Sequence, residues 1–156
     1  MIWSLFICAA LVVLDQITKF CAVSFLKPVE SVTLAQGILD LTYVENRGMA
    51  FGFLQGARWL FVGLTLLILV GIAIYYVRLP RGPKYRKVRF ALILISSGAA
   101  GNLIDRFRNG FVVDFFHVRF VDFPVFNIAD SYVVVGTIFF ALIMIFLNWE
   151  DEKPVV

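Results

Sequence analysis

Four aspartates are the strongest candidates for chemistry, because the sequence around each of them is rich in apolar residues. Asp130 opens a long apolar stretch, Asp15 and Asp105 lie near the ends of two others, and Asp114 is flanked by valines and phenylalanines. A carboxylate at the centre of a membrane helix costs roughly 2.5–3.5 kcal/mol on insertion scales, so such acids usually face a cavity, a partner or a substrate. Two carboxyls at close range cannot both ionise, so one keeps a proton while the other activates a water. Such a pair can hydrolyse a peptide bond without a metal or a cofactor.

The composition is that of an integral membrane protein. The chain has 156 residues, of which 61% are hydrophobic and 16% charged, a balance outside the range of ordinary soluble domains. Four stretches approach the ~20 apolar residues that span a bilayer: residues 2–26, 58–77, 90–107 and 128–148. We therefore predict a single membrane domain, residues 1–156, with an all-α polytopic fold of four transmembrane helices.

Basic residues predict the orientation, because Lys and Arg in short loops stay on the cytoplasmic side. The connection between the second and third spans, residues 78–89, has no acidic residue and holds Arg78, Arg81, Lys84, Arg86, Lys87 and Arg89. We expect this loop and both termini in the cytoplasm, and residues 27–57 and 108–126 outside. The net charge of +3 lies mostly in this loop, so it does not indicate a nucleic-acid partner.

The two exterior segments have patterns of their own. In the first, apolar and polar residues alternate over Leu39–Val44, Asn46-Arg47-Gly48 is a turn signal, and Met49–Leu54 is apolar again, which predicts a small β-hairpin at the membrane surface. The second segment is rich in Phe. We expect it to form an apolar loop or short helix that dips into the interface and could serve as a lid.

The third span contains a cluster of small residues. Ser97 and Gly101 have the small-xxx-small spacing that lets membrane helices approach closely, so this span is predicted to be the central packing helix. Asn102, Asp105 and Arg106 follow at positions i, i+3 and i+4, which place their side chains on one helix face.

The topology brings the polar residues of three spans to one depth. The first and third spans run outward and the fourth runs inward, so their outer ends are neighbours. These ends carry Asp15, Lys19, Asn102, Asp105, Arg106, Asn127 and Asp130, and the exterior segments add Asn46 and Asp114. The simplest arrangement is a polar site that is half-sunk in the outer leaflet and covered by both exterior segments.

Structural roles would also explain several of these residues. Asp15 and Lys19, at i and i+4, could form an ion pair that makes both tolerable in lipid. Asp105 stands beside Arg106 and close to Arg108, so it is well supplied with countercharge.

The remaining candidates have plain alternatives as well. Asn127 and Asp130 have the spacing of a helix N-cap and an N3 acid, which alone would account for both. Asp114 could be an ordinary acid on the solvent-exposed face of a strand. The single histidine, His117, could be a surface or interface residue that takes no part in a Ser-His-Asp triad. With one histidine and no metal-ligand spacing, the sequence suggests no metal site.

Five short motifs follow one another along the chain and carry a resemblance to a known family. They are Asp15-Gln16-x-Thr18-Lys19, Asn46-x-Gly48-x-Ala50-Phe51, Gly101-Asn102-x-x-Asp105-Arg106, Val113-Asp114-Phe115 and Phe126-Asn127-x-Ala129-Asp130-Ser131. Together they resemble the lipoprotein signal peptidases, the type II signal peptidases of bacteria. The resemblance runs in order from the first span to the last.

The resemblance implies an aspartic endopeptidase of the bacterial inner membrane that needs no cofactor. Its substrate would be a prolipoprotein, cut just before a cysteine that carries diacylglycerol, and its other partner the membrane lipid; we expect a monomer. In that family the catalytic pair matches Asp114 and Asp130. Positions that line or support the site match Asn46, Asn102, Arg106, Asn127, Asp15 and Lys19. The family also has an extracytoplasmic β-cradle and a mobile exterior helix or loop, here about residues 29–54 and 108–125.

Asp105 competes with Asp114 for the catalytic role. Next to Arg106 it is expected to stay ionised and paired, whereas the apolar setting of Asp114 raises a carboxyl pKa. Asp130, in the first turn of its helix, is stabilised as an anion by the helix N-terminus. We therefore expect Asp105 to support the site, Asp130 to hold the charge and Asp114 the proton, with the two titrating as a coupled pair.

A proton-coupled transporter or channel is the main rival hypothesis, since buried acids also form ion pathways. That hypothesis predicts polar residues strung across the bilayer, but the second span has one Thr and no charge. A purely structural protein would not explain five polar motifs on one side. The Gly-x-Gly-Asp signature of presenilin-type proteases is absent from the sequence.

Overall fold

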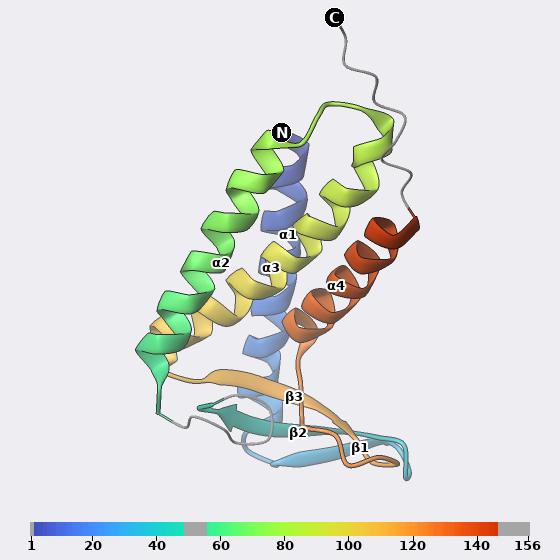
Figure 1. Cartoon of the computed structure of the whole chain (residues 1–156). Helices are drawn as coiled ribbons and strands as arrows, with labels where there is room; N and C mark the ends of the chain where they lie inside the picture. Colours follow the sequence, from blue (N-terminus) through green and yellow to red (C-terminus); the bar gives the residue numbers. More distant parts are fainter. Residues whose placement is uncertain (1, 49–55, 147–156) are drawn as a thin grey trace, which may run out of the picture.

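Four long helices and a small antiparallel sheet make up the computed structural model, which describes residues 2–48 and 56–146 (Figure 1). The helices are α1 (Ile2–Cys21), α2 (Arg58–Arg78), α3 (Arg86–Asn109) and α4 (Ile128–Phe146), and the strands are β1 (Ser31–Ala35), β2 (Leu39–Asn46) and β3 (Val112–Val118). A π-helical turn, η1 (Ala22–Leu26), extends α1, and a 3₁₀ turn, η3 (Pro83–Tyr85), precedes α3. The predicted fold class, a four-helix membrane protein with a small sheet, is confirmed.

Four helical segments of the described residues are long and apolar enough to cross a membrane. They are Ile2–Leu26, Arg58–Arg78, Pro83–Asn109 and Ile128–Phe146. The third begins before residue 90, where we expected its span to start, because the basic residues of the preceding connection already form its first turns. Figure 1 shows the start of α1, the α2–α3 connection and the end of α4 at one end of the bundle, with the sheet at the other.

The strands pair in the order β1-β2-β3, and both pairs are antiparallel. The β1–β2 hairpin turns through residues 36–38 and not at residues 46–48, where the turn signal lay. Gly37, with a φ of 72°, supplies the left-handed backbone that a tight hairpin needs. Asn46 ends β2 with a smaller turn, in which Gly48 N–H donates to Asn46 Oδ1 at 3.1 Å. The apolar residues Met49–Leu54 lie outside the described residues.

Residues 112–118 form β3 in place of the loop or short helix expected there, and the loop is confined to the residues that follow. Valine and phenylalanine favour strands. Gly110, with a φ of 83°, ends α3 by donating its N–H to the Arg106 carbonyl, so the chain turns at once into the strand. In the register of the sheet, Asp114 pairs with Val44 of β2. This segment is therefore part of the sheet.

Small residues let α3 pack closely against its neighbours, as predicted. It contacts all three other long helices, and Ser97 is fully buried. A Cβ at Gly101 would overlap the Asp15 carboxylate of α1. On another face, a Cβ at Gly98 would overlap the Ala129 carbonyl oxygen of α4 and lie 2.7 Å from Val133 Cγ2. Each glycine therefore sets the distance between α3 and one neighbour.

Two apolar clusters hold the two ends of the molecule. The first joins the α2–α3 connection to α3 and to the end of α4, and its buried members are Leu79, Tyr85, Val88, Ala91, Leu92 and Ile143. The second joins η1 to β3 through Ala22, Leu26, Val113 and Phe115, with Ile128 of α4 packed against it. The second cluster therefore fixes the sheet against the ends of α1 and α4.

Replacing Gly98 by alanine is expected to destabilise the helix bundle, because the new methyl group would overlap the α4 backbone. Overpacking of this kind costs about 1–3 kcal/mol. Gly71→Ala is the matched control, since a Cβ at Gly71 of α2 meets no atom within 4 Å, and it should leave stability unchanged or slightly raised. Thermal unfolding in detergent micelles measures both, and equal unfolding temperatures for the two variants would contradict the close α3–α4 packing.

Candidate active site

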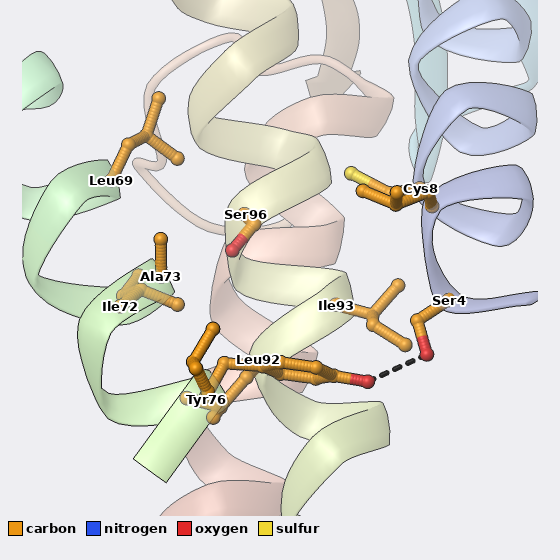
Figure 2. Close-up of a pocket in the computed structure, with 11 residues that line it drawn as sticks. Ser4, Cys8, Leu69, Ile72, Ala73, Tyr76, Leu92, Ile93 and Ser96 are labelled. Atoms are coloured by element: carbon orange, nitrogen blue, oxygen red, sulfur yellow. Dashed lines mark hydrogen bonds between the residues drawn. The ribbon is translucent and has the colours of Figure 1, made fainter. Parts of the chain in front are cut away.

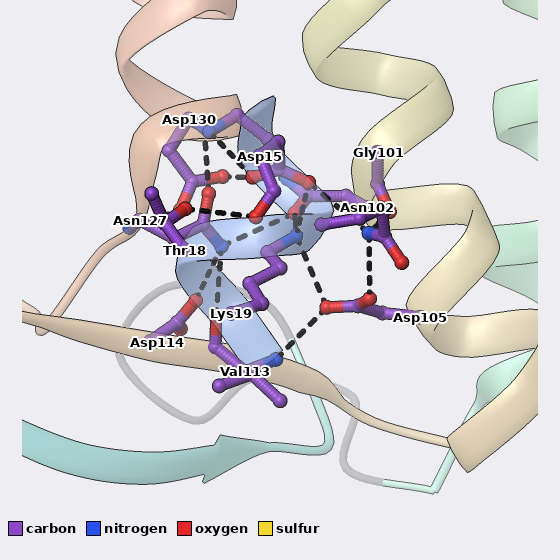
Figure 3. A network of polar contacts seen from close by, with 12 residues as sticks. Asp15, Thr18, Lys19, Gly101, Asn102, Asp105, Val113, Asp114, Asn127 and Asp130 are labelled. Atoms are coloured by element: carbon purple, nitrogen blue, oxygen red, sulfur yellow. Dashed lines mark hydrogen bonds and ion pairs between the residues drawn. The ribbon is translucent and has the colours of Figure 1, made fainter. Parts of the chain in front are cut away.

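Lys19 is the centre of a buried ion network at the sheet end of the bundle (Figure 3). Its Nζ lies 3.0 Å from Asp15 Oδ2 and 3.0 Å from Asp105 Oδ2, and it donates to Asn102 Oδ1 at 2.9 Å. An ammonium group has three N–H donors, so all of them are used. Lys19 is only 3% exposed and Asp15 is fully buried. The Asp15–Lys19 pair that the spacing indicated is therefore present, with Asp105 as a second anion.

The two carboxylates that share Lys19 also accept backbone N–H groups. Ala129 N–H donates to Asp15 Oδ1 at 3.1 Å, and Val113 N–H donates to Asp105 Oδ2 at 3.1 Å. Gln16 Nε2 bridges the pair, at 3.2 Å from Asp15 Oδ2 and 3.0 Å from Asp105 Oδ1. The network therefore joins α1 and α3 to the start of α4 and to β3.

Asp105 forms its ion pair with Lys19. Arg106, which we expected to pair with it, interacts with the Asp105 charge but makes no ion pair with it. Successive residues on a helix point about 100° apart, so Arg106 leaves the face that carries Asp105. The Arg106 guanidinium lies over the Phe61 ring of α2, 5.2 Å from its centroid. It has no hydrogen-bond or ion-pair partner among residues 2–48 and 56–146.

A reciprocal capping box starts α4. Asn127 N–H donates to Asp130 Oδ2 at 3.1 Å, and Asp130 N–H donates to Asn127 Oδ1 at 2.9 Å. Asn127 is therefore the N-cap and Asp130 the N3 acid, as their spacing predicted. The box holds the Asp130 carboxylate at the helix N-terminus, where the dipole stabilises an anion.

Two asparagines connect this carboxylate to the rest of the site. Asn127 Nδ2 donates to Asp114 Oδ1 at 2.6 Å, so one residue contacts both Asp114 and Asp130. Asn102 Nδ2 donates to Asp130 Oδ1 at 2.7 Å, while Asn102 Oδ1 accepts from Lys19. The ion network therefore continues without a break into the pair of aspartates, as Figure 3 shows.

Asp114 is buried in the sheet and not on a wet strand face, since only 1% of it is exposed. Its second oxygen accepts from Asn46 Nδ2 of β2 at 2.9 Å. Burial raises the pKa of Asp114 to about 7, and the negative charge of Asp130 adds to that rise, while the hydrogen bonds from Asn46 and Asn127 oppose it. A carboxyl with this pKa can hold a proton near neutral pH.

Hydrogen bonds and ion pairs connect all the predicted site residues except Arg106: Asp15, Lys19, Asn46, Asn102, Asp105, Asp114, Asn127 and Asp130. We assigned no role to Gln16, whose only signal was its place in the first motif. The N–H donors of Val113 and Ala129 have no signal in the sequence, because every residue type except proline supplies one. Within residues 2–48 and 56–146, no cluster of three His, Cys, Asp or Glu side chains could hold a metal ion.

Known proteins match this chain over most of its length. The profile of the family described as signal peptidase (SPase) II matches residues 7–146. Proteins named lipoprotein signal peptidase from Streptococcus pyogenes serotypes M6 and M5 are each 44% identical over 142 residues, which cover 91% of this chain and 90% of the relative.

Two solved structures have the same fold. One is described as a bacterial membrane enzyme determined by the in meso method at 2.3 Å resolution. It has a TM-score of 0.85 and 31% sequence identity, and the alignment covers 98% of this chain and 94% of the chain of that structure. Another with the same description, at 1.9 Å resolution, has a TM-score of 0.81 and 31% identity, covering 97% and 96%. Since the family profile spans every predicted site residue from Asp15 to Asp130, this chain belongs to the signal peptidase II family.

Proposed function

We propose that this protein is an aspartic endopeptidase that removes signal peptides from prolipoproteins. It hydrolyses the bond before a diacylglyceryl-modified cysteine, using Asp114, Asp130 and an activated water. Family membership supports the substrate class. The observation that carries the catalytic assignment is that Asn127 hydrogen-bonds both carboxylates, because a common partner holds the two acids close together, and the Asp130 charge contributes to the raised pKa of Asp114.

The two carboxyls begin the reaction in different protonation states. Asp130 accepts hydrogen bonds from Asn127 N–H and Asn102 Nδ2, and we assign it the role of the carboxylate. Asp114, with its raised pKa, holds the proton. In the first step Asp130 takes a proton from water as the water oxygen attacks the scissile carbonyl carbon, and Asp114 gives its proton to the carbonyl oxygen.

The gem-diol formed in that step then collapses. The carbon–nitrogen bond breaks as the proton on Asp130 moves to the leaving nitrogen, and a hydroxyl of the gem-diol returns a proton to Asp114 as the new carbonyl forms. The products are a carboxylic acid and an amine, and both aspartates recover their starting states. The step consumes one water and no other reactant.

Arg106 is proposed to hold the carbonyl oxygen of the substrate. Its guanidinium interacts electrostatically with Asp130, Asp114 and Asp105, yet none of its N–H groups has a hydrogen-bond acceptor among the described residues. Five donors are therefore available to a bound peptide. In a site shielded from water, a donor aimed at an oxygen that gains negative charge is worth more than it is in solution.

Asp15, Lys19 and Asp105 are proposed to support the site without reacting. Lys19 neutralises both neighbouring carboxylates and holds Asn102 Oδ1. That contact turns the Asn102 amide nitrogen toward Asp130. The ion network therefore orients a group that stabilises the charged member of the pair.

The protein is a multi-pass membrane protein by its family and its four apolar helices, and we propose the bacterial cytoplasmic (inner) membrane with both termini in the cytoplasm. The basic connection between α2 and α3 lies at the opposite end of the bundle from the sheet (Figure 1). Since basic loops stay in the cytoplasm, this arrangement supports an active site near the outer leaflet. We also propose that the protein acts as a monomer.

Replacing Asp114 or Asp130 by asparagine is expected to slow cleavage of a diacylglyceryl-modified prolipoprotein by about 10²–10⁴-fold, because one proton transfer is lost. Asp105→Asn keeps both transfers and should retain activity in proportion to the amount of folded protein. Asp122→Asn, at an exposed position of the same exterior segment as Asp114, is the control and should cut at the wild-type rate. Cleavage is measured with detergent-purified protein. A folded Asp105→Asn enzyme that is inactive, beside an active Asp114→Asn enzyme, would show that the pair is misassigned.

The catalytic efficiency kcat/KM is expected to fall as the pH rises through about 7, because Asp114 then loses the proton that it must donate. Asn46 stabilises the charged form of Asp114, so Asn46→Ala should raise the pKa and move this alkaline limb to higher pH. Asn109→Ala, at an exposed position of α3, should leave it in place. The limb should also persist in His117→Gln, which removes the side chain type that ordinarily titrates near neutral pH. Loss of the limb in His117→Gln, or no shift in Asn46→Ala, would argue against Asp114.

Lys19→Met is expected to destabilise the protein by about 3–5 kcal/mol, because two buried carboxylates lose their countercharge. Lys27→Met is the matched control. Its ammonium pairs with Glu45 at 3.1 Å, but the side chain is 52% exposed, and exposed pairs contribute little to stability. Unfolding in detergent, together with the yield of monodisperse protein, measures both variants. Equal losses would mean that the Lys19 network is not a structural requirement.

A further inference from the structure

An apolar cleft opens between α1, α2 and α3 in the half of the bundle away from the sheet (Figure 2). Its volume is about 310 Å³, and its walls include Leu5, Leu69, Ile72, Ala73, Leu92 and Ile93. That volume falls at the lower end of the range of about 300–1,000 Å³ for pockets that hold organic ligands. The proposed peptidase site lies at the opposite end of the helices, so the cleft is separate from it.

A second, polar pocket adjoins this cleft. It has a volume of about 250 Å³ and is lined by Ser4, Tyr76, Val77, Leu79, Arg81 and Arg89. Ser4, Tyr76 and Val77 line both pockets. At this junction the Tyr76 hydroxyl donates to Ser4 Oγ at 2.6 Å, which joins α2 to α1 as Figure 2 shows. The two pockets therefore form one surface that is apolar at one end and basic at the other.

The two arginines of the basic pocket are held differently. Arg89 Nη2 donates to the carbonyl oxygens of Leu79 at 2.8 Å and Pro80 at 3.0 Å, and its guanidinium lies 5.6 Å from the centroid of the Tyr76 ring. Arg81 is exposed and has no hydrogen-bond or ion-pair partner in the part of the chain that the structure describes. The pocket therefore offers one fixed and one free guanidinium to an anion.

We propose that this surface binds one anionic phospholipid of the cytoplasmic leaflet. An acyl chain fills the apolar cleft, and the phosphodiester lies at Arg81 and Arg89. Charge complementarity supports this occupant, because guanidinium groups match phosphate oxygens in geometry and charge. Basic pockets between membrane helices on the cytoplasmic side bind such headgroups.

Other occupants would satisfy only one end of this surface. A helix of a second copy would cover the apolar cleft, but the acidic residues of the described helices, Asp15, Asp105 and Asp130, all belong to the site at the sheet end and not to the end that holds the arginines. A free phosphate would pair with the arginines but leave the cleft open. A phospholipid joins both chemistries in one molecule, and the junction at Tyr76 lies near the end of α2, which stops at Arg78.

Native mass spectrometry of the detergent-solubilised full chain tests the proposal, with phosphatidylglycerol and phosphatidylcholine of identical acyl chains as probes. We expect one phosphatidylglycerol to bind more tightly than phosphatidylcholine. Arg81→Gln should weaken that binding about fivefold, the effect of one basic residue near a membrane surface. Arg86→Gln removes the same charge from an exposed position at the start of α3 without lining the pocket, so it should change binding less than Arg81→Gln does.

A second pair of variants tests the acyl chain. Ala73→Phe fills the cleft and should weaken binding to a similar extent, whereas Ala141→Phe adds the same bulk at an exposed position of α4 and should have no effect. Equal affinity for the two lipids, or equal losses of affinity in Arg81→Gln and Arg86→Gln, would mean that lipids bind only by nonspecific electrostatic attraction, which would overturn the proposal. Unchanged binding in Ala73→Phe, or a protein dimer in place of a lipid adduct, would overturn it as well.

Discussion

The structure depends on the buried ammonium group of Lys19, which lies in the protein interior, where an unpaired charge is unstable. A buried charge must be paired and hydrogen-bonded to persist. Lys19 meets this requirement only if Asp15 of α1 and Asp105 of α3 lie on either side of it. Those carboxylates in turn need the N–H groups of Ala129 and Val113. One charge therefore fixes how two helices, the start of a third and a strand meet.

Much of the fold and of the site could be predicted, because both follow from residue type and order along the chain. The length of each apolar stretch indicates a span, and alternating spans bring the polar ends together. The partner of Asp105 could not be predicted in the same way. Nearness in sequence favoured Arg106 as the ion-pair partner of Asp105. The partner is set instead by the direction in which the Asp105 side chain points from its helix, and in that direction lies Lys19 of α1.

The sheet shows a second limit of sequence patterns. Asn46-Arg47-Gly48 has the composition of a hairpin turn, yet β2 continues through Asn46 because this residue pairs with Val112 of β3, a strand far away in the sequence. Strand formation depends on such distant neighbours more than on local preference. The same holds for backbone N–H donors, which complete the ion network without any signal in the sequence.

The capping box of α4 uses one side chain for two tasks. Asp130 closes the first turn of the helix through Asn127 N–H, and in the proposed mechanism it also takes up a proton in each cycle. A protonated carboxyl is a weaker acceptor than a carboxylate, so the helix start loosens when Asp130 is protonated and tightens when it is not. In the proposed mechanism the first turn of α4 is therefore held more weakly during the part of the cycle in which Asp130 carries the proton.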